Sequence, residues 1–92
     1  MIKYEVERTA QFKKDYKLLK KRGYNVELLK EVISILASGD KLPARYKDHA
    51  LRGEFLGCRE CHVTPDWLLI YEIDDDTLVL YLSRTGTHSD LF

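Results

Sequence analysis

The stretch Arg59-Glu-Cys-His62-Val-Thr-Pro-Asp66-Trp67-Leu-Leu-Ile-Tyr71 decides the fold, because it predicts a β-hairpin around one tight turn. Thr64-Pro65-Asp66 supplies the turn, since proline suits the second position of a type I turn and Asp or Thr side chains bond to nearby backbone. The flanking segments alternate in polarity and are rich in β-branched and aromatic residues, which is typical of strands. The hairpin therefore gathers an imidazole, a carboxylate and an indole close to its turn.

The residues before the hairpin predict a strand followed by two antiparallel helices. Apolar and charged residues alternate over residues 2–7, as in a strand with one buried face. Thr9 is a suitable N-cap for a first helix, which Gly23 ends. Asn25 and Gly39 bound a second helix in the same way, and the short connection between the two helices predicts a helical hairpin.

The rest of the chain predicts a loop and a three-stranded meander. Residues 40–56 lose periodicity and contain proline and glycine, which is typical of an irregular surface loop. Strands are expected at residues 58–63, 67–73 and 77–83, and the middle strand is apolar on both faces, so it should be central. The sequence thus predicts one α+β domain over residues 1–92: an N-terminal strand, a helical hairpin and a three-stranded antiparallel meander that form one sheet.

Composition fits a small cytoplasmic domain. The chain has 92 residues, of which 45% are hydrophobic, and this argues against disorder. No apolar run approaches the ~20 residues that a membrane-spanning helix needs, and the N-terminus lacks the apolar run of a signal peptide. We therefore expect a cytoplasmic protein with no membrane contact and with reduced thiols.

The charges are unevenly distributed, although the formal net charge is zero. Residues 1–52 carry 13 lysines and arginines against 7 acidic residues, whereas residues 53–92 carry 2 against 8. One face of the first helix and its end hold many of the cations: Lys13, Lys14, Lys17, Lys20, Lys21 and Arg22. This face is interpreted either as a solvated surface, favoured at its end by the helix dipole, or as an electrostatic footprint for RNA.

The topology of the meander brings several polar residues to one edge of the sheet. The end of its first strand, the start of its second and the end of its third meet there. His62, Asp66 and Arg84 occupy these positions, and His88 follows four residues after Arg84. His49 lies on a loop long enough to join them.

Such a cluster has the groups needed to cleave RNA by attack of its own 2′-OH. A base takes the hydroxyl proton, an acid protonates the leaving 5′-oxygen, and cations stabilise the phosphorane. Histidine can fill both proton-transfer roles near neutral pH without a metal. Trp67, Tyr71 and Phe92 could stack on splayed bases. The competing interpretation is that the histidines are capping or surface residues at strand ends.

The segment Cys58-Arg-Glu-Cys61-His62 also matches the C-x-x-C-H pattern of c-type haem attachment. Met1 is the only methionine and no export signal is present, so the segment lacks the usual context of a haem site. In a strand, residues three apart face opposite sides, so the two sulfurs could not share a zinc ion or another ligand. Free cysteines are the preferred interpretation, and no metal or cofactor is expected.

Three segments together resemble the YafQ family of bacterial toxins, within the RelE/ParE superfamily of type II toxin–antitoxin systems. They are Tyr46-Lys47-Asp48-His49-Ala-Leu51, the hairpin stretch from Arg59 to Tyr71, and Arg84-Thr-Gly-Thr-His88-Ser-Asp-Leu-Phe92. The resemblance covers nearly the whole chain and implies a RelE-like fold. It also implies a ribosome-dependent, metal-independent endoribonuclease that cuts mRNA in the decoding site and so inhibits translation.

Matching these motifs residue by residue implies two groups of site residues. The acid/base positions of the family fall on His49, His62, Asp66 and His88. The candidates for binding or supporting the substrate are Trp67, Phe92, Lys47, Tyr71 and Arg84. Of these, Arg84 resembles the cation that stabilises the phosphate in the superfamily. We favour His88 as the general acid and Asp66 or His49 as the base, although the sequence does not assign these roles.

The resemblance also implies partners: a DinJ-like antitoxin with a ribbon-helix-helix DNA-binding end, the ribosome with its mRNA, and operator DNA through the toxin–antitoxin complex. Two other functions stay open. A ParE-type toxin inhibits DNA gyrase without cleaving RNA, but that branch generally lacks the histidines. A degenerate toxin would bind only its antitoxin and the operator. Members of the family are usually basic, and positive charge favours binding to ribosomal RNA. The neutral net charge of this chain departs from that pattern.

Overall fold

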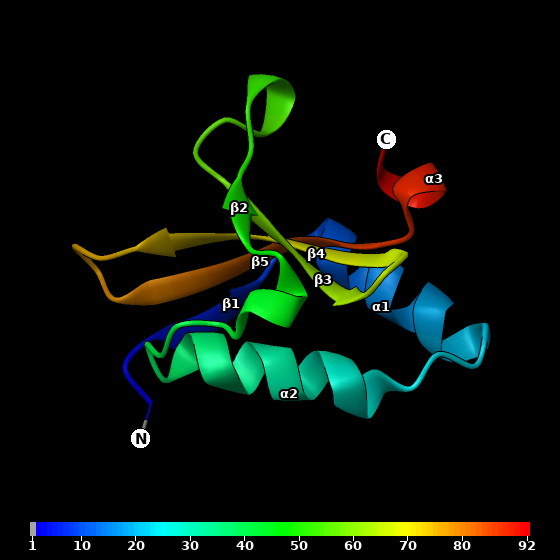
Figure 1. Ribbon diagram of the computed structural model, residues 1–92, viewed down its shortest axis with the longest axis horizontal. Helices are drawn as coiled ribbons and strands as arrows, with labels where there is room; N and C mark the ends of the chain where they lie inside the picture. The colour runs from blue at the N-terminus through cyan, green and yellow to red at the C-terminus, as the bar shows by residue number, and fades with distance from the viewer. Residues whose placement is uncertain (1) are drawn as a thin grey trace.

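One five-stranded sheet forms the centre of the protein, as the computed structural model shows for residues 2–92 (Figure 1). The strands are β1 (Glu5–Arg8), β2 (His49–Ala50), β3 (Arg59–Thr64), β4 (Trp67–Asp74) and β5 (Val79–Gly86). They lie in the order β1-β5-β4-β3-β2, in which β1 pairs with β5 in parallel and the other neighbours are antiparallel. The α+β class and the predicted meander are therefore confirmed.

Two helices cover one face of the sheet, and a short third helix lies on the other face (Figure 1). They are α1 (Ala10–Lys21), α2 (Val26–Ala37) and α3 (His88–Leu91). Thr9 caps α1 and Asn25 caps α2, each by accepting a hydrogen bond from a backbone N–H of the first turn. Two single turns of 3-10 helix, η1 (Ala44–Tyr46) and η2 (Gly53–Phe55), interrupt the loop between α2 and β3. Within residues 2–92, no helix is long and apolar enough to cross a membrane.

The central strand β4 is buried on both faces, as its sequence predicts. Trp67, Leu69 and Tyr71 pack with apolar side chains of α1 and α2 in the main core. Leu68 and Ile70 point to the other face, where they pack with α3 and with apolar residues of the loop before β3. All five side chains are at most 1% exposed. The sheet therefore needs a covering layer on each side.

The sheet has one strand more than predicted, and its first strand is shorter. The predicted irregular loop contains β2, so His49 lies in a short edge strand that pairs with β3. β1 begins at Glu5, because the backbone N–H groups of Lys3 and Tyr4 both donate to the Ala37 carbonyl at the end of α2. Lys3 and Tyr4 are thus tied to α2 before the chain enters the sheet.

The last strand is displaced along the chain relative to the predicted range 77–83. It begins at Val79, because Leu78 has a left-handed φ of 56° and belongs to the preceding turn. It continues to Gly86, past a bulge in its pairing with β4. Arg84 therefore lies within β5 rather than beyond its end.

A buried ion pair fixes α1 against the end of β5. The Asp15 carboxylate accepts hydrogen bonds from Arg84 Nε at 2.9 Å, from Arg84 Nη2 at 3.1 Å and from the Thr85 backbone N–H at 3.2 Å. Asp15 is 7% exposed. The paired region of β1 ends at Arg8 opposite Leu82, so Asp15 provides the acceptor that a strand would otherwise supply to Thr85.

We expect Asp15→Ala to lower the free energy of unfolding by about 1.5–3 kcal/mol, the range for hydrogen bonds to charged groups. The reason is that the Arg84 guanidinium and the Thr85 N–H both lose their acceptor. Urea denaturation followed by circular dichroism would measure the change, with the m value unaltered. Lys14→Ala, at an exposed position of the same helix, is the control and should change stability by less than about 0.5 kcal/mol. An equally small change in Asp15→Ala would show that the pair does not anchor α1.

Candidate active site

Three histidine rings and two phenylalanine rings form a row on the face of the sheet opposite α1 and α2. The ring centroids of His49 and His62 are 6.4 Å apart, those of His62 and His88 are 6.0 Å apart, and those of His88 and Phe92 are 6.3 Å apart. Phe55 extends the row, with its ring 5.8 Å from that of Phe92. The structure thus brings together His62 and His88, which the meander topology predicted to meet, and His49, whose loop was long enough to join them.

Two carboxylates contact this histidine row. Oε1 of Glu60 lies 3.3 Å from Nε2 of His49 and 4.0 Å from Nε2 of His62. Asp66 Oδ1 lies 3.4 Å from Nδ1 of His88. The Glu60 side chain is 6% exposed, whereas that of Asp66 is 76% exposed at the tip of the hairpin. One carboxylate is therefore buried beneath the row, and the other stands at its solvent side.

Glu60 was not among the residues that the sequence singled out. It lies two positions before His62 in β3, and alternate residues of a strand share a face. It is also the register partner of His49 across the β2–β3 pair. Strand alternation could have predicted its place next to His62, but its contact with His49 depends on β2, which the sequence did not reveal.

Backbone carbonyls orient two of the imidazole rings. Nδ1 of His49 donates to the Lys47 carbonyl at 2.8 Å, and Nδ1 of His62 donates to the Pro65 carbonyl at 3.2 Å. A carbonyl can only accept, so each contact selects the ring form that carries a proton on Nδ1. The Nε2 atoms of both rings then face Glu60. Lys47 adopts a left-handed φ of 49°, which turns its carbonyl back toward His49.

Asp48 anchors the segment that carries His49. Its carboxylate accepts hydrogen bonds from the Tyr71 hydroxyl and from Arg59, with Arg59 Nη2 at 2.9 Å. Burial and this hydrogen bond to Asp48 raise the pKa of Tyr71. The Tyr46-Lys47-Asp48-His49 segment therefore has a structural explanation: Lys47 orients the ring of His49, and Asp48 ties the segment to β3 and β4.

The structure corrects the expectation that Trp67 and Tyr71 stack on bases. Both are 1% exposed and lie in the main core on the helix side of the sheet, so neither ring is accessible to RNA. The indole N–H of Trp67 donates to the Thr85 hydroxyl at 2.9 Å, which donates in turn to the Leu68 carbonyl at 2.8 Å. Both residues therefore support the site from the helix side of the sheet. Phe92 is 64% exposed, and its ring remains accessible.

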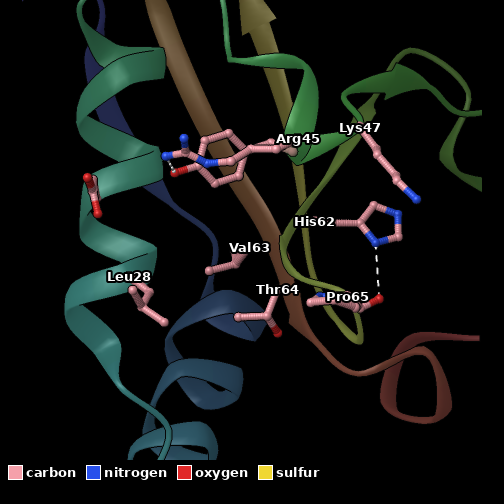
Figure 2. Close-up of a pocket in the computed structure, with 9 residues that line it drawn as sticks. Leu28, Arg45, Lys47, His62, Val63, Thr64 and Pro65 are labelled. Atoms are coloured by element: carbon pink, nitrogen blue, oxygen red, sulfur yellow. Dashed lines mark hydrogen bonds between the residues drawn. The ribbon is translucent and has the colours of Figure 1, made fainter.

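Two cations were among the predicted site residues: Arg84, which was expected to stabilise the phosphate, and Lys47, a candidate for binding the substrate. The Arg84 guanidinium is bound to Asp15 through two nitrogens, and among the described residues no hydrogen bond or ion pair joins it to a histidine. Lys47 is exposed and extends from the end of η1 toward the ring of His62 (Figure 2). Lys47 is therefore better placed than Arg84 to meet a phosphate at the histidine row.

The helix α3 that carries His88 is fixed by Asp90. Its carboxylate accepts a bond from the Thr87 backbone N–H at 3.0 Å, which completes a capping box, and pairs with Arg22 at 2.9 Å. The Arg22 guanidinium, followed by the Thr87 N–H, lowers the pKa of the Asp90 carboxyl. His88 and Phe92 are thus held to the end of α1.

The two cysteines lie on opposite faces of the sheet, as their spacing predicted. Cys61 belongs to the main core and Cys58 packs against the smaller apolar cluster with Leu68 and Ile70. Both are free thiols. Burial raises the pKa of the Cys61 thiol to about 12. This geometry does not allow Cys58 and Cys61 to share a ligand.

The arrangement as a whole supplies the components of proton transfer at a phosphate. Imidazoles that face one another can act as base and acid, and adjacent carboxylates hold them in place. The two outer histidines of the row are exposed: the side chain of His49 is 49% exposed and that of His88 is 57% exposed. An extended RNA strand could therefore lie across it.

Comparisons with known proteins agree over the full length of the chain. The sequence model of the family described as "Bacterial toxin of type II toxin-antitoxin system, YafQ" matches residues 4–92. The mRNA interferase toxin YafQ of Escherichia coli strain K12 is 44% identical over 93 residues, which cover 100% of this chain and 99% of that protein.

Solved structures also resemble this chain over nearly its full length. The crystal structure of YafQ from E. coli strain BL21(DE3) has a TM-score of 0.91 at 42% identity, over 97% of this chain and 98% of that chain. A chain of the crystal structure of the E. coli DinJ-YafQ toxin-antitoxin complex has a TM-score of 0.89 at 43% identity, over 99% of both chains.

Tyr71→Phe tests the Asp48 anchor through the pH dependence of stability. Because the pKa of Tyr71 is raised in the folded protein, its contribution is fully present below the ordinary value of about 10 and is lost as the pH rises beyond it. We expect the variant to lose about 1.5–3 kcal/mol at neutral pH, because the hydroxyl donates to a carboxylate. We also expect a smaller further loss than the unmodified protein shows above about pH 10.

Urea denaturation at several pH values would measure both effects, with Tyr81→Phe at an exposed tyrosine as the matched control. If Tyr71→Phe and the unmodified protein lost stability in parallel as the pH rose, the hydroxyl would not be bonded to Asp48 in the way described.

Proposed function

The chain belongs to the YafQ family of bacterial type II toxins, and on that basis we propose that it is an mRNA interferase that cleaves mRNA on the ribosome. The observation that carries the proposal is the exposed histidine row with its two carboxylates. The cleavage we propose uses the 2′-OH of the RNA as the nucleophile and requires no metal. It leaves a 2′,3′-cyclic phosphate on one product and a 5′-hydroxyl on the other.

The order of the rings supports an assignment of roles. His49 and His88 stand on either side of His62, and an in-line displacement needs a base and an acid on opposite sides of the phosphorus. We assign His49 as the base, with Glu60 beside its Nε2 to stabilise the proton that it takes from the 2′-OH. His88 is the acid that protonates the leaving 5′-oxygen, and Asp66 holds its Nδ1 so that Nε2 faces the substrate.

His62 and Lys47 fit the remaining role, the binding of the phosphate between base and acid. His62 lies in the middle of the row, and the Lys47 side chain extends toward it (Figure 2). Cationic donors at the non-bridging oxygens stabilise the charge that develops in the phosphorane. Arg84 does not take this part in the proposal, because its guanidinium is bound to Asp15.

Dependence on the ribosome fits the openness of the site. The row lies on an exposed surface, so the protein alone provides little to hold an RNA strand in the in-line geometry. A ribosome would present a fixed mRNA, and the lysine-rich face of α1 would dock on ribosomal RNA despite the zero net charge of the chain. A protein that acts on translating ribosomes would work in the cytoplasm.

The same family membership suggests the partner. The E. coli relative is solved as a DinJ-YafQ toxin–antitoxin complex. We propose that a DinJ-like antitoxin binds and neutralises this chain and that the complex binds operator DNA through the antitoxin.

His88→Ala should abolish mRNA cleavage while leaving the fold intact. Loss of a general acid costs about 10²–10⁴-fold in rate, and the His88 side chain is 57% exposed, so its removal leaves the core packing unchanged. Primer extension on a reporter mRNA, after induction of the protein in cells, would show translation-dependent cuts that vanish in the variant. Growth arrest with uncut mRNA would instead indicate a gyrase-type inhibitor, and full toxicity of His88→Ala would remove His88 from the mechanism.

A substrate with sulfur in place of the leaving 5′-oxygen distinguishes the residue that acts as general acid from the one that acts as general base. A thiolate leaves without protonation, so the sulfur substrate should restore His88→Ala to near the rate of the unmodified protein. His49→Ala should stay slow, because the 2′-OH still needs a base. Rescue of His49→Ala and not of His88→Ala would reverse the assignment.

A further inference from the structure

A cavity of about 470 Å³ lies beside the histidine row, between α2 and the edge of β3 (Figure 2). Its volume falls within the range of roughly 300–1,000 Å³ that is typical of small-ligand sites. The cavity borders the proposed active site, because His62 and Lys47 line it as well. A ligand in the cavity would therefore lie next to the phosphate that the row is proposed to cleave.

The floor of the cavity is apolar. Leu28 of α2 faces Val63 and Pro65 of β3 and its turn across the cavity (Figure 2). Leu28 is 38% exposed, so this apolar surface is accessible from solvent. Such an apolar surface suits the face of a flat ring.

The upper rim of the cavity is cationic and partly fixed. The Arg45 guanidinium lies 4.7 Å over the ring of Tyr46, and its Nη2 donates to the Tyr46 hydroxyl at 2.9 Å. Tyr46 is itself buried, so it holds Arg45 in one orientation at the exposed surface. Lys47 adds a second cation at the other end of the cavity, beside His62 (Figure 2). A fixed guanidinium suits the face of a base, and an ammonium group suits a phosphate.

We infer that this cavity is the subsite for one nucleotide of the mRNA, the one that adjoins the scissile phosphate. Its base packs against Leu28 and Val63 below Arg45, and its phosphate binds Lys47 beside His62. The inference deepens the proposed function and rests on it. An apolar segment of a partner protein is the other conceivable occupant, but the two cations that line the cavity and the shared His62 favour RNA.

Glu31 gives the subsite a preference among bases. It lies one turn after Leu28 on α2 and lines the same cavity. A carboxylate can only accept hydrogen bonds, and adenine and cytosine carry an exocyclic amino group at the position where uracil and guanine carry a carbonyl oxygen. The subsite therefore favours adenine or cytosine over uracil.

Binding to the free protein tests the subsite without requiring cleavage. Adenosine 5′-monophosphate would be titrated into protein with labelled methyl groups, and NMR would follow Leu28 and Val63, with uridine 5′-monophosphate and inorganic phosphate as comparison probes. We expect saturable shifts at both methyl positions that are weaker with the uridine nucleotide and absent with phosphate. Arg45→Ala should remove them, whereas Lys41→Ala, which deletes a cation of the same loop outside the cavity, should not.

Single-turnover cleavage of ribosome-bound mRNA tests the role in the reaction. For Arg45→Ala we expect the toxin concentration that gives half the maximal rate to rise by about tenfold, with the maximal rate within about twofold. Lys41→Ala should match the unmodified protein. Glu31→Gln should reduce the discrimination against uracil next to the cut, whereas Glu27→Gln, one turn earlier on α2 and outside the cavity, should not.

The outcomes separate the two proposals. If the unmodified protein cut no mRNA, the proposed function would fail, even where adenosine 5′-monophosphate still bound the cavity. If it cut mRNA but Arg45→Ala kept the same half-maximal concentration and the nucleotide gave no shifts, the subsite would be overturned alone. Weaker antitoxin binding by Arg45→Ala, with unchanged mRNA kinetics, would assign the cavity to the partner protein and would likewise overturn it.

Discussion

The burial of β4 on both faces is the constraint on which the structure depends. Trp67 and its alternate neighbours require α1 and α2 on one side, while Leu68 and Ile70 require a second covering layer on the other. That second layer consists of α3 and the loop before β3, which also carry His88 and His49. The packing that covers two apolar side chains therefore brings both histidines to His62. The same packing that completes the core therefore also assembles the candidate site.

The supporting residues explain how an exposed site can still be ordered. Carbonyl groups of Lys47 and Pro65 fix two imidazoles, and Asp48 and Asp90 tie the segments that carry His49 and His88 to the body of the protein. Each of these bonds joins protein groups to one another, so the order of the row does not depend on a bound substrate. The protein thus holds its own catalytic side chains in order. In the proposed mechanism the ribosome positions the mRNA.

Much of this site could be predicted from the sequence, since strand order alone places His62, Asp66 and the segment of His88 at one edge. The parts of the site that depend on buried residues could not be predicted. Glu60 meets His49 only because β2 forms, and two residues in a loop rich in proline and glycine give no periodic signal. Trp67 and Tyr71 were expected to stack on bases because aromatic rings often do so. Their place in the alternation of β4 instead buries them, where their polar atoms bond to Thr85 and Asp48.

The central claim is that the row moves protons for attack by the 2′-OH of the RNA itself. The most direct measurement compares two ribosome-bound mRNAs that differ only in a 2′-deoxy substitution at the nucleotide before the cut. We expect the normal mRNA to give a 2′,3′-cyclic phosphate and the substituted mRNA to remain intact at that position. Cleavage of the substituted mRNA at the normal rate would show that another nucleophile attacks, and it would contradict the claim.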